Sequence, residues 1–186
     1  MEKLTSWLDI ASHYLEKGYS VFPVGTNKKP LIVWKEYQTR KPTLEELTQW
    51  GKQFPNANIG LVTGEISGVV VVDIDPRHGG TDEDFKNITT VKSKTGGGGF
   101  HLFFRYESGV INQAGIKGGI DIRGQGGFVV LPPSIHESGN KYEWINSPDT
   151  TSLAPLPDFV KSWLSNQIQE KDKTSWSQSL LSGVNE

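Results

Sequence analysis

A run of four valines, 69–72, predicts a β-strand that is covered on both faces and lies near the middle of a sheet. Asp73 and Asp75 follow the run, and Pro76 ends the strand. Since residues two apart in a strand point to the same face, about 6.6 Å apart along it, both carboxylates leave the same side at its carboxyl end. Two anions so close beside an apolar sheet repel each other and resist desolvation, and a hard divalent cation such as Mg²⁺ or Mn²⁺ would relieve both effects. The alternative interpretation is that the aspartates only open a turn.

Other apolar or alternating stretches predict further strands, and two helical patterns precede most of them. The first helix is capped by Thr5 or Ser6 and runs to about Lys17; a capping box of Thr43 and Glu46 opens the second, which ends near residue 54. A short helix at 81–86 and a last helix beginning at Pro157 are also predicted. The predicted strands are 20–24, 58–63, 68–75, 91–95, 100–105, 118–124, 126–131 and 142–144.

The order of these elements favours an α+β domain with a largely antiparallel sheet over a doubly wound parallel fold. Residues 64–67 are predicted as a hairpin-like turn, and strand 126–131 is predicted to pair back on strand 118–124. From about Ser165 the chain is polar and rich in Ser, Gln and Lys. The predicted domain therefore covers residues 1–165, and 166–186 is predicted to form a polar tail or linker.

Composition narrows the functional classes. The chain has 186 residues, 35% of them apolar and 22% charged, as expected for one globular domain. It contains no cysteine, which excludes disulfides and thiolate zinc sites and fits a reducing cytoplasm. No apolar run approaches the roughly 20 residues that cross a bilayer, so no membrane partner is expected. Because the net charge is −2, any contact with nucleic acid must be local, in a groove with a few Lys and Arg.

Four successive glycines, 96–99, join a predicted strand to an aromatic strand that contains His101. Such a loop suits backbone amides that face an anion, although a flexible hairpin turn is the simpler interpretation. It is not a P-loop, because no Gly-Lys-Ser/Thr follows. A histidine just past an anion-binding loop can donate to a phosphate oxygen, whereas a lone histidine in an apolar strand is more often a core residue.

Strand 118–124 alternates strictly, so that Asp121 and Arg123 share one face. The two can be a plain ion pair, or a third metal ligand next to an anion clamp. Lys28 and Lys29 lie in a predicted turn, where they are either solvated or positioned to contact phosphates.

Several short motifs occur in an order that resembles one known family. They are, in chain order, Ala11 to Pro23 (A-x-x-Y-x-x-x-G-x-x-V-F-P), Lys28-Lys29-Pro30 with Trp34, Asn58 to Gly64 (NIGLVTG), Val71 to Pro76 (VVDIDP), Thr95-Gly96 with His101 to Arg105 (HLFFR), Gly119 to Gly124 (GIDIRG), Gly127 to Ser134 (GFVVLPPS), and Gly139 with Tyr142 and Trp144. Over about residues 8–164 the chain resembles the primase–polymerase (prim-pol) branch of the archaeo-eukaryotic primase superfamily. That branch is found at the amino end of many phage and plasmid replication proteins.

The resemblance implies an archaeo-eukaryotic primase-like catalytic core, with an RRM-like, mostly antiparallel sheet flanked by helices, plus an N-terminal α/β module. Asp73, Asp75 and Asp121 match the family's catalytic carboxylates, which hold two divalent ions, Mg²⁺ or Mn²⁺. His101 matches the histidine that contacts the phosphates of the incoming nucleotide. Further nucleotide contacts are implied for Arg123, for Gly97, Gly98 and Gly99 and, more loosely, for Lys28, Lys29 and Ser134.

The implied function is template-dependent nucleotidyl transfer, as a DNA primase or DNA polymerase, by a two-metal mechanism. The implied partners are a single-stranded DNA template, a primer, NTP or dNTP substrates, and a helicase fused to the chain or encoded in the same operon. The implied location is the cytoplasm, for a bacterial, phage or plasmid product. Candidate template contacts are Lys92, Lys94, Arg105 and Lys117, with Trp34 or Tyr37 stacking on bases.

One position departs from the family pattern, and other functions stay open. The family often has Ser two residues before its histidine; here that position is Gly99, so backbone amides must replace one hydroxyl donor. A single-stranded nucleic-acid-binding module without catalysis would share the glycine loop and the basic side chains. A metal-dependent nuclease would share the clustered aspartates but not the triphosphate cradle. A plain structural domain is the remaining alternative.

Overall fold

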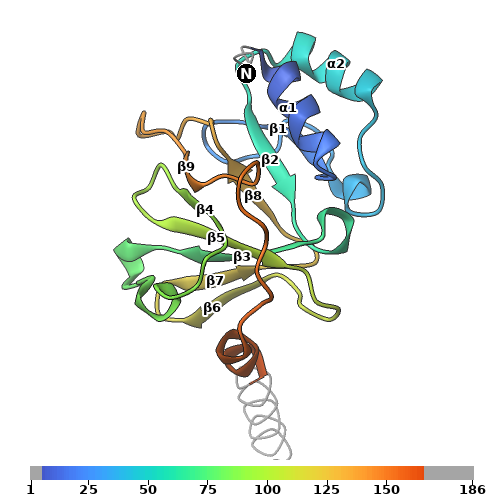
Figure 1. The fold of residues 1–186 in the computed structure, drawn as a ribbon. Helices are drawn as coiled ribbons and strands as arrows, with labels where there is room; N and C mark the ends of the chain where they lie inside the picture. Colours follow the sequence, from blue (N-terminus) through green and yellow to red (C-terminus); the bar gives the residue numbers. More distant parts are fainter. Residues whose placement is uncertain (1–5, 166–186) are drawn as a thin grey trace, which may run out of the picture. The chain divides into compact units, whose positions relative to one another are not determined.

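The chain divides into two compact units, Met1–Pro155 and Leu156–Glu186. The computed structural model describes residues 6–165 (Figure 1). The helices of the first unit are α1 (Trp7–Glu16), η1 (Lys35–Gln38), α2 (Leu44–Gln53), η2 (Glu65–Ser67), η3 (Pro76–His78) and η4 (Glu83–Phe85), where η marks a 3₁₀ helix. Its strands are β1 (Val21–Val24), β2 (Asn58–Val62), β3 (Val69–Ile74), β4 (Val91–Lys94), β5 (Phe100–Arg105), β6 (Gln113–Lys117), β7 (Ile120–Arg123), β8 (Phe128–Leu131) and β9 (Glu143–Asn146).

Strand β3 lies inside the larger of two sheets, whose order is β6-β7-β3-β5-β4-β9. A second sheet has the order β1-β2-β8, and the strands of both sheets pair antiparallel. All four valines of β3 are fully buried. Val69 and Val71 enter the main core, and Val70 and Val72 point to the opposite face, so both faces of the strand are covered. The prediction of an α+β fold with antiparallel pairing and a buried central strand is confirmed. The RRM-like arrangement and the N-terminal α/β module stay predictions.

The predicted pairing of strand 126–131 with strand 118–124 is wrong. This strand, β8, pairs with β2 in the second sheet. Thr63, just after β2, explains the difference: its hydroxyl donates to the Gly124 carbonyl (2.6 Å) and its amide donates to the Gly127 carbonyl (3.0 Å). These bonds hold the glycine turn after β7 at the end of β2, so the chain leaves the larger sheet there.

Two further details differ from the pattern. Residues 64–67 do form a hairpin-like turn, closed by a bridge between Gly64 and Val69, but the strands on either side belong to different sheets. Strand β6 is not predicted by the pattern, because it contains two small residues and buries only Ile116. It pairs with β7 at the edge of the larger sheet.

Helices α1 and α2 lie against each other beside the three-stranded sheet (Figure 1). Of the two predicted caps of α1, Ser6 is the one whose side chain accepts from the Asp9 amide. The capping box of α2 is confirmed: Thr43 Oγ1 accepts from the Glu46 amide (3.1 Å), and Glu46 Oε2 accepts from the Thr43 amide (2.8 Å). The helices thus begin where local chemistry predicts.

Tyr14 of α1 ties this helix to segments more than 100 residues away. Its hydroxyl donates to the Pro132 carbonyl (2.6 Å) and accepts from Trp144 Nε1 (3.0 Å). Tyr14→Phe keeps the ring but leaves both groups without their partner, so the free energy of unfolding should fall by about 2 kcal/mol. Urea unfolding monitored by tryptophan fluorescence measures this change. Tyr106→Phe, at a half-buried position, is the control, and equal losses in the two variants would contradict the assignment.

In the second unit, residues 158–165 are helical, as the pattern from Pro157 predicts. The predicted tail, 166–186, lies outside the described residues, and the domain boundary at residue 165 stays a prediction. Within residues 6–165, no helix has the length and apolar character needed to cross a membrane.

Candidate active site

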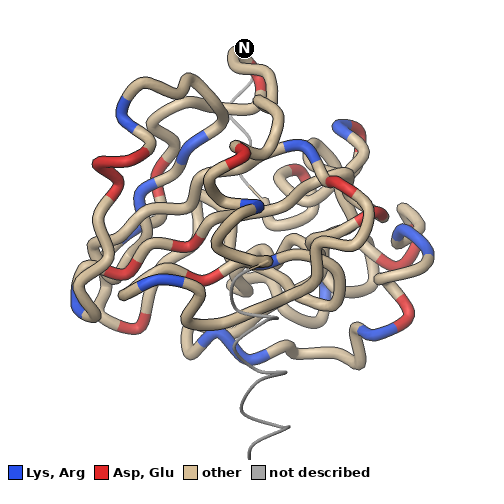
Figure 2. The backbone as a smooth tube through the Cα atoms, turned by 90° about the horizontal axis from the view of Figure 1, so that it is seen from below, with Lys and Arg blue, Asp and Glu red and all other residues tan. Residues whose placement is uncertain are grey.

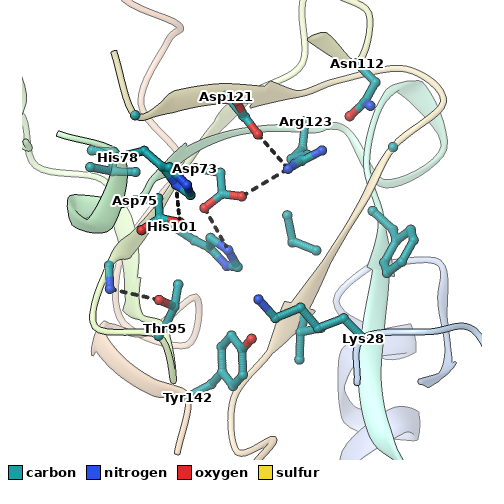
Figure 3. A pocket seen from close by; sticks show the side chains of 18 of the residues that line it. Lys28, Asp73, Asp75, His78, Thr95, His101, Asn112, Asp121, Arg123 and Tyr142 are labelled. Atoms are coloured by element: carbon teal, nitrogen blue, oxygen red, sulfur yellow. Dashed lines mark hydrogen bonds and ion pairs between the residues drawn. The ribbon is translucent and has the colours of Figure 1, made fainter. Parts of the chain in front are cut away.

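A row of residues crosses the larger sheet at the carboxyl end of β3 and gathers ionisable side chains there. Asp73 of β3 lies opposite Asp121 of β7 on one side and opposite His101 of β5 on the other. Residues directly opposite each other in paired strands project from the same face. Asp121, Asp73 and His101 therefore share one face of the sheet and point toward one another (Figure 3).

Arg123 links the two aspartates of this row. Its Nη2 lies 2.8 Å from Asp121 Oδ2 and 3.4 Å from Asp73 Oδ2, and His101 Nε2 lies 3.5 Å from Asp73 Oδ1. Burial by itself raises the pKa of Asp73, but the charges and hydrogen bonds of His101 and Arg123 outweigh it and hold that pKa below its ordinary value. Asp73 is thus an anion at neutral pH, with Arg123 on one side of it and His101 on the other. Asp121 is also fixed by the Gly115 amide, which donates to its Oδ1 (2.7 Å).

Apart from its contact with Asp73, His101 is held by packing. It is 6% exposed, and its ring contacts those of Phe103 and Tyr142, with centroids 6.2 Å away in both cases. Its Nδ1 and the Oγ of Ser93, the residue opposite it on β4, are buried without a hydrogen-bond partner among the described residues. The Nε2 edge therefore faces the carboxylates and the pocket.

Asp75 lies just past β3, where two glycines clamp its backbone. Its amide donates to the Gly119 carbonyl (2.8 Å), and its carbonyl accepts from the Gly80 amide (3.0 Å). Gly119 has φ +67°, and a Cβ there would lie 2.1 Å from the Gly80 nitrogen, so only glycine fits. The turn between β6 and β7 therefore sets the position of Asp75 beside Asp73.

The carboxylate of Asp75 already has partners. Arg77 Nε and Nη2 lie 3.0 and 2.9 Å from its two oxygens, and His78 Nδ1 lies 3.0 Å from Oδ2. The hydrogen bonds from Arg77 hold the pKa of Asp75 well below its usual range, against the opposing effect of burial. Asp75 therefore stays ionised, and both of its carboxylate oxygens already contact Arg77 or His78.

The glycine loop is a defined turn rather than an open ring of amides. The Gly98 amide donates to the Thr95 carbonyl and the Gly99 amide to Thr95 Oγ1, both at 3.0 Å. A Cβ on Gly99 would lie 2.1 Å from the Ile74 carbonyl oxygen, so the loop packs directly on the end of β3. In this structure the contact leaves no room for a serine side chain at position 99. Of the three amides expected to face phosphates, only that of Gly97 takes no part in closing the turn.

A pocket of about 680 Å³, within the usual size range for small-molecule sites, contains this cluster. Its lining also includes Lys28, Trp34, Phe128 and Tyr142. Figure 3 shows Lys28 and Tyr142 facing the carboxylates across the pocket. Burial raises the pKa of Tyr142 to about 12, so its hydroxyl is neutral. Lys28 has φ 63°, the one positive value of a non-glycine residue in the described part of the chain. The predicted site residues that line this pocket are Asp73, Asp75, Asp121, His101, Arg123, Gly97, Gly99 and Lys28.

Three predicted site residues do not line the pocket: Gly98, Lys29 and Ser134. Ser134 is 5% exposed, and its hydroxyl accepts from the Ile59 amide (3.0 Å), so it braces the second sheet. Lys29 is exposed on the loop after β1. Pocket residues that the sequence did not single out as site residues include Arg77, His78, Thr95, Asn112 and Tyr142. Position is the signal for Arg77 and His78, which directly follow the Asp-x-Asp-Pro motif, whereas Thr95 and Tyr142 stand in motifs that carry the family resemblance.

The candidate template contacts differ in their exposure and in whether they are already paired with other side chains. Tyr37 is 4% exposed, with its hydroxyl on Glu46 Oε1 (2.9 Å), so it has no ring face open to a base and this prediction is wrong. Lys92 and Lys117 are paired with Asp82 and Asp84 respectively. Lys94 and Arg105 are exposed, and Trp34 is half-buried at the pocket wall. Basic and acidic residues are interspersed over the backbone rather than gathered on one side (Figure 2).

The three aspartates suit a hard divalent cation, but in the structure their carboxylates contact arginine side chains. Carboxylate oxygens are the ligands that Mg²⁺ and Mn²⁺ prefer, and three such groups line one pocket. Among residues 6–165, however, no three His, Cys, Asp or Glu side chains converge closely enough to hold a metal ion. Each aspartate instead faces a cationic side chain, Arg123 or Arg77. The carboxylates are already paired with these arginines, so a divalent cation would bind them by replacing those contacts.

Comparison with known proteins gives one family. The family described as bifunctional DNA primase/polymerase, N-terminal (Prim-Pol) matches residues 11–159, about four-fifths of the chain. The match includes every residue of the pocket wall named above. No curated protein sequence matches the chain.

Proposed function

The chain belongs to the Prim-Pol family of bifunctional DNA primase/polymerase N-terminal domains, and from this premise we propose that it transfers nucleotides onto a growing strand on a single-stranded DNA template. The reaction forms a bond between a 3′-hydroxyl oxygen and the α-phosphorus of a nucleoside triphosphate. It breaks the bond from that phosphorus to the β-phosphate, and pyrophosphate leaves. The catalytic task is to position the two reactants and to neutralise charge.

One observation carries this proposal: the row Asp121–Asp73–His101, with Arg123 on the same face, beside a glycine turn in a nucleotide-sized pocket. Divalent cations held by Asp73, Asp75 and Asp121 would supply Lewis-acid activation of the hydroxyl and charge stabilisation of the leaving group. A non-catalytic nucleic-acid-binding domain has no need of three carboxylates in one pocket. The ionised state of Asp73 and Asp75 at neutral pH is the state that cation binding requires.

The other residues bind and orient the substrate in this proposal. His101 Nε2 and the Arg123 guanidinium donate to triphosphate oxygens, and the free Gly97 amide adds a neutral donor. Trp34 and Phe128, whose ring centroids lie 5.1 Å apart at an angle of 68°, offer an aromatic wall on which a base can stack. Lys28 also lines the pocket and supplies positive charge on the side away from Arg123 (Figure 3).

Extension of a labelled strand tests the function. A single-stranded template, with or without an annealed labelled primer, is incubated with NTPs or dNTPs and Mg²⁺ or Mn²⁺, and product lengths are read on a denaturing gel. The expected result is a lengthened primer, with a requirement for the divalent cation. Shortening of the labelled strand would indicate a nuclease instead. Template binding with no change in strand length under any of these conditions would indicate a non-catalytic binding module.

A further inference from the structure

Arg77 lies at the pocket with no role in the mechanism described so far. It belongs to η3, the single 3₁₀ turn that follows β3, and its side chain is 59% exposed, against 29% for Arg123. Its Nε and Nη2 contact both oxygens of Asp75, and its backbone amide donates to Asp75 Oδ1 (2.9 Å). The side chain is therefore oriented by a single carboxylate and is otherwise open to solvent.

The same guanidinium also lies over the glycine turn. A Cβ built on Gly97 would be 3.5 Å from Arg77 Nη2 and 3.6 Å from its Cζ, which is ordinary van der Waals contact. Gly97 is the residue whose amide takes no part in closing the turn. Arg77 therefore stands between Asp75 and the surface where triphosphate oxygens would be bound. The Asp75 contacts occupy Nε and Nη2, and a guanidinium carries five N–H donors, so others are left for a second acceptor.

Charge balance indicates what happens when substrate enters. In the structure Arg77 forms an ion pair with Asp75, and Arg123 forms ion pairs with Asp73 and Asp121. A divalent cation at Asp75 would repel the guanidinium and take its acceptor oxygens. The phosphates that arrive with the cation offer pairs of anionic oxygens, which a planar guanidinium binds with two parallel hydrogen bonds. Because Arg77 is the more exposed of the two arginines and its side chain is hydrogen-bonded to one carboxylate only, it can change partners at the smaller cost.

On the premise of the proposed function, we propose that Arg77 is a triphosphate-binding residue that exchanges partners: it occupies Asp75 in the empty site and moves onto the phosphates when nucleotide and cation bind. Arg77 thus competes with the cation in the absence of nucleotide and cooperates with it in its presence. A residue that only braced Asp75 would help cation binding in both states. The two roles therefore predict changes of opposite sign for the cation alone.

Two binding measurements separate these roles. Mn²⁺ binding to the full chain without nucleotide is followed by the electron paramagnetic resonance signal of free Mn²⁺. Binding of a non-hydrolysable dNTP analogue in the presence of Mn²⁺ is followed by calorimetry. The variants are Arg77→Ala and Arg77→Lys, with Arg40→Ala as the control. Arg40 is also a surface arginine paired with carboxylates, those of Glu36 and Glu46, but it lies outside the pocket.

Arg77→Ala is expected to bind Mn²⁺ alone severalfold more tightly than wild type and the triphosphate analogue about tenfold or more weakly. Arg77→Lys keeps the charge but loses the planar guanidinium, so its affinities should lie between those of wild type and Arg77→Ala. Arg40→Ala should match wild type in both measurements. Weaker Mn²⁺ binding by Arg77→Ala, or unchanged triphosphate binding, would overturn the exchange.

The wild-type protein separates failure of this inference from failure of the function. If wild type extends a primer and binds the analogue while Arg77→Ala shows neither expected change, only the exchange is wrong. If wild type neither extends a primer nor binds the analogue with Mn²⁺, the proposed function is wrong and the inference falls with it.

Discussion

Replacing Asp73 by asparagine is expected to reduce nucleotide incorporation by at least about 10³-fold, with the fold retained. Asp73 is the central member of the row, with Asp121 and His101 opposite it on the two neighbouring strands. Asparagine has the same shape but no charge, so it would neither hold a divalent cation nor balance Arg123. Initial rates of primer extension at saturating nucleotide measure the loss, and circular dichroism checks the fold.

A matched neutralisation shows whether the loss comes from the site. Glu36→Gln also removes one carboxylate from an arginine pair, but Glu36 is exposed on η1 and lies outside the pocket. Its rate should stay within about twofold of wild type, because surface ion pairs contribute little. An Asp73→Asn protein that extends primers at the wild-type rate would remove Asp73 from the chemistry. The two-metal proposal would fall with it.

Restoring the serine that the family pattern often has two residues before its histidine is expected to damage this protein. A Cβ at position 99 would lie 2.1 Å from the Ile74 carbonyl oxygen and 3.1 Å from Pro76 Cδ, and neither neighbour is the end of a flexible side chain. Gly99→Ser must therefore push the glycine turn away from β3. We expect a loss of about 2 kcal/mol in the free energy of unfolding, and a fall of about tenfold or more in triphosphate affinity, because Gly97 and His101 move with the turn.

Gly97→Ala is the control for the stability part of this prediction. The atoms nearest to a Cβ at Gly97 would be those of the Arg77 guanidinium and Thr95 Oγ1, at 3.5 Å or more, and the residue needs no positive φ. Its free energy of unfolding should stay within about 0.5 kcal/mol of wild type. Urea unfolding of both variants and calorimetric titration of Gly99→Ser with a triphosphate analogue and Mn²⁺ give the values. A Gly99→Ser protein as stable as wild type would show that the turn can move away from β3 at little cost.

Strand existence, helix caps and the identity of the buried strand could be read from the sequence, because each depends on neighbours within a few residues. The capping box of Thr43 and Glu46 is local chemistry, and the burial of Val69 to Val72 follows from an unbroken apolar run. The shared face of Asp121 and Arg123 follows from the period of two in a strand. Several local motifs in one order also predicted the family, which matches residues 11–159.

Other features depend on contacts between distant segments, so only the tertiary structure decided them. The register that sets Asp73 between Asp121 and His101 is fixed by pairing across about 30 to 50 residues, which no local pattern encodes. Ser134 lies in a motif that resembles a site but points its hydroxyl at the Ile59 amide, and strand β8 left the larger sheet because Thr63 holds the turn before it. The chain by itself determined which side chains were available to bind a charged substrate. Non-local backbone pairing decided which of them meet and, through Arg77 and Arg123, which are already neutralised before any substrate arrives.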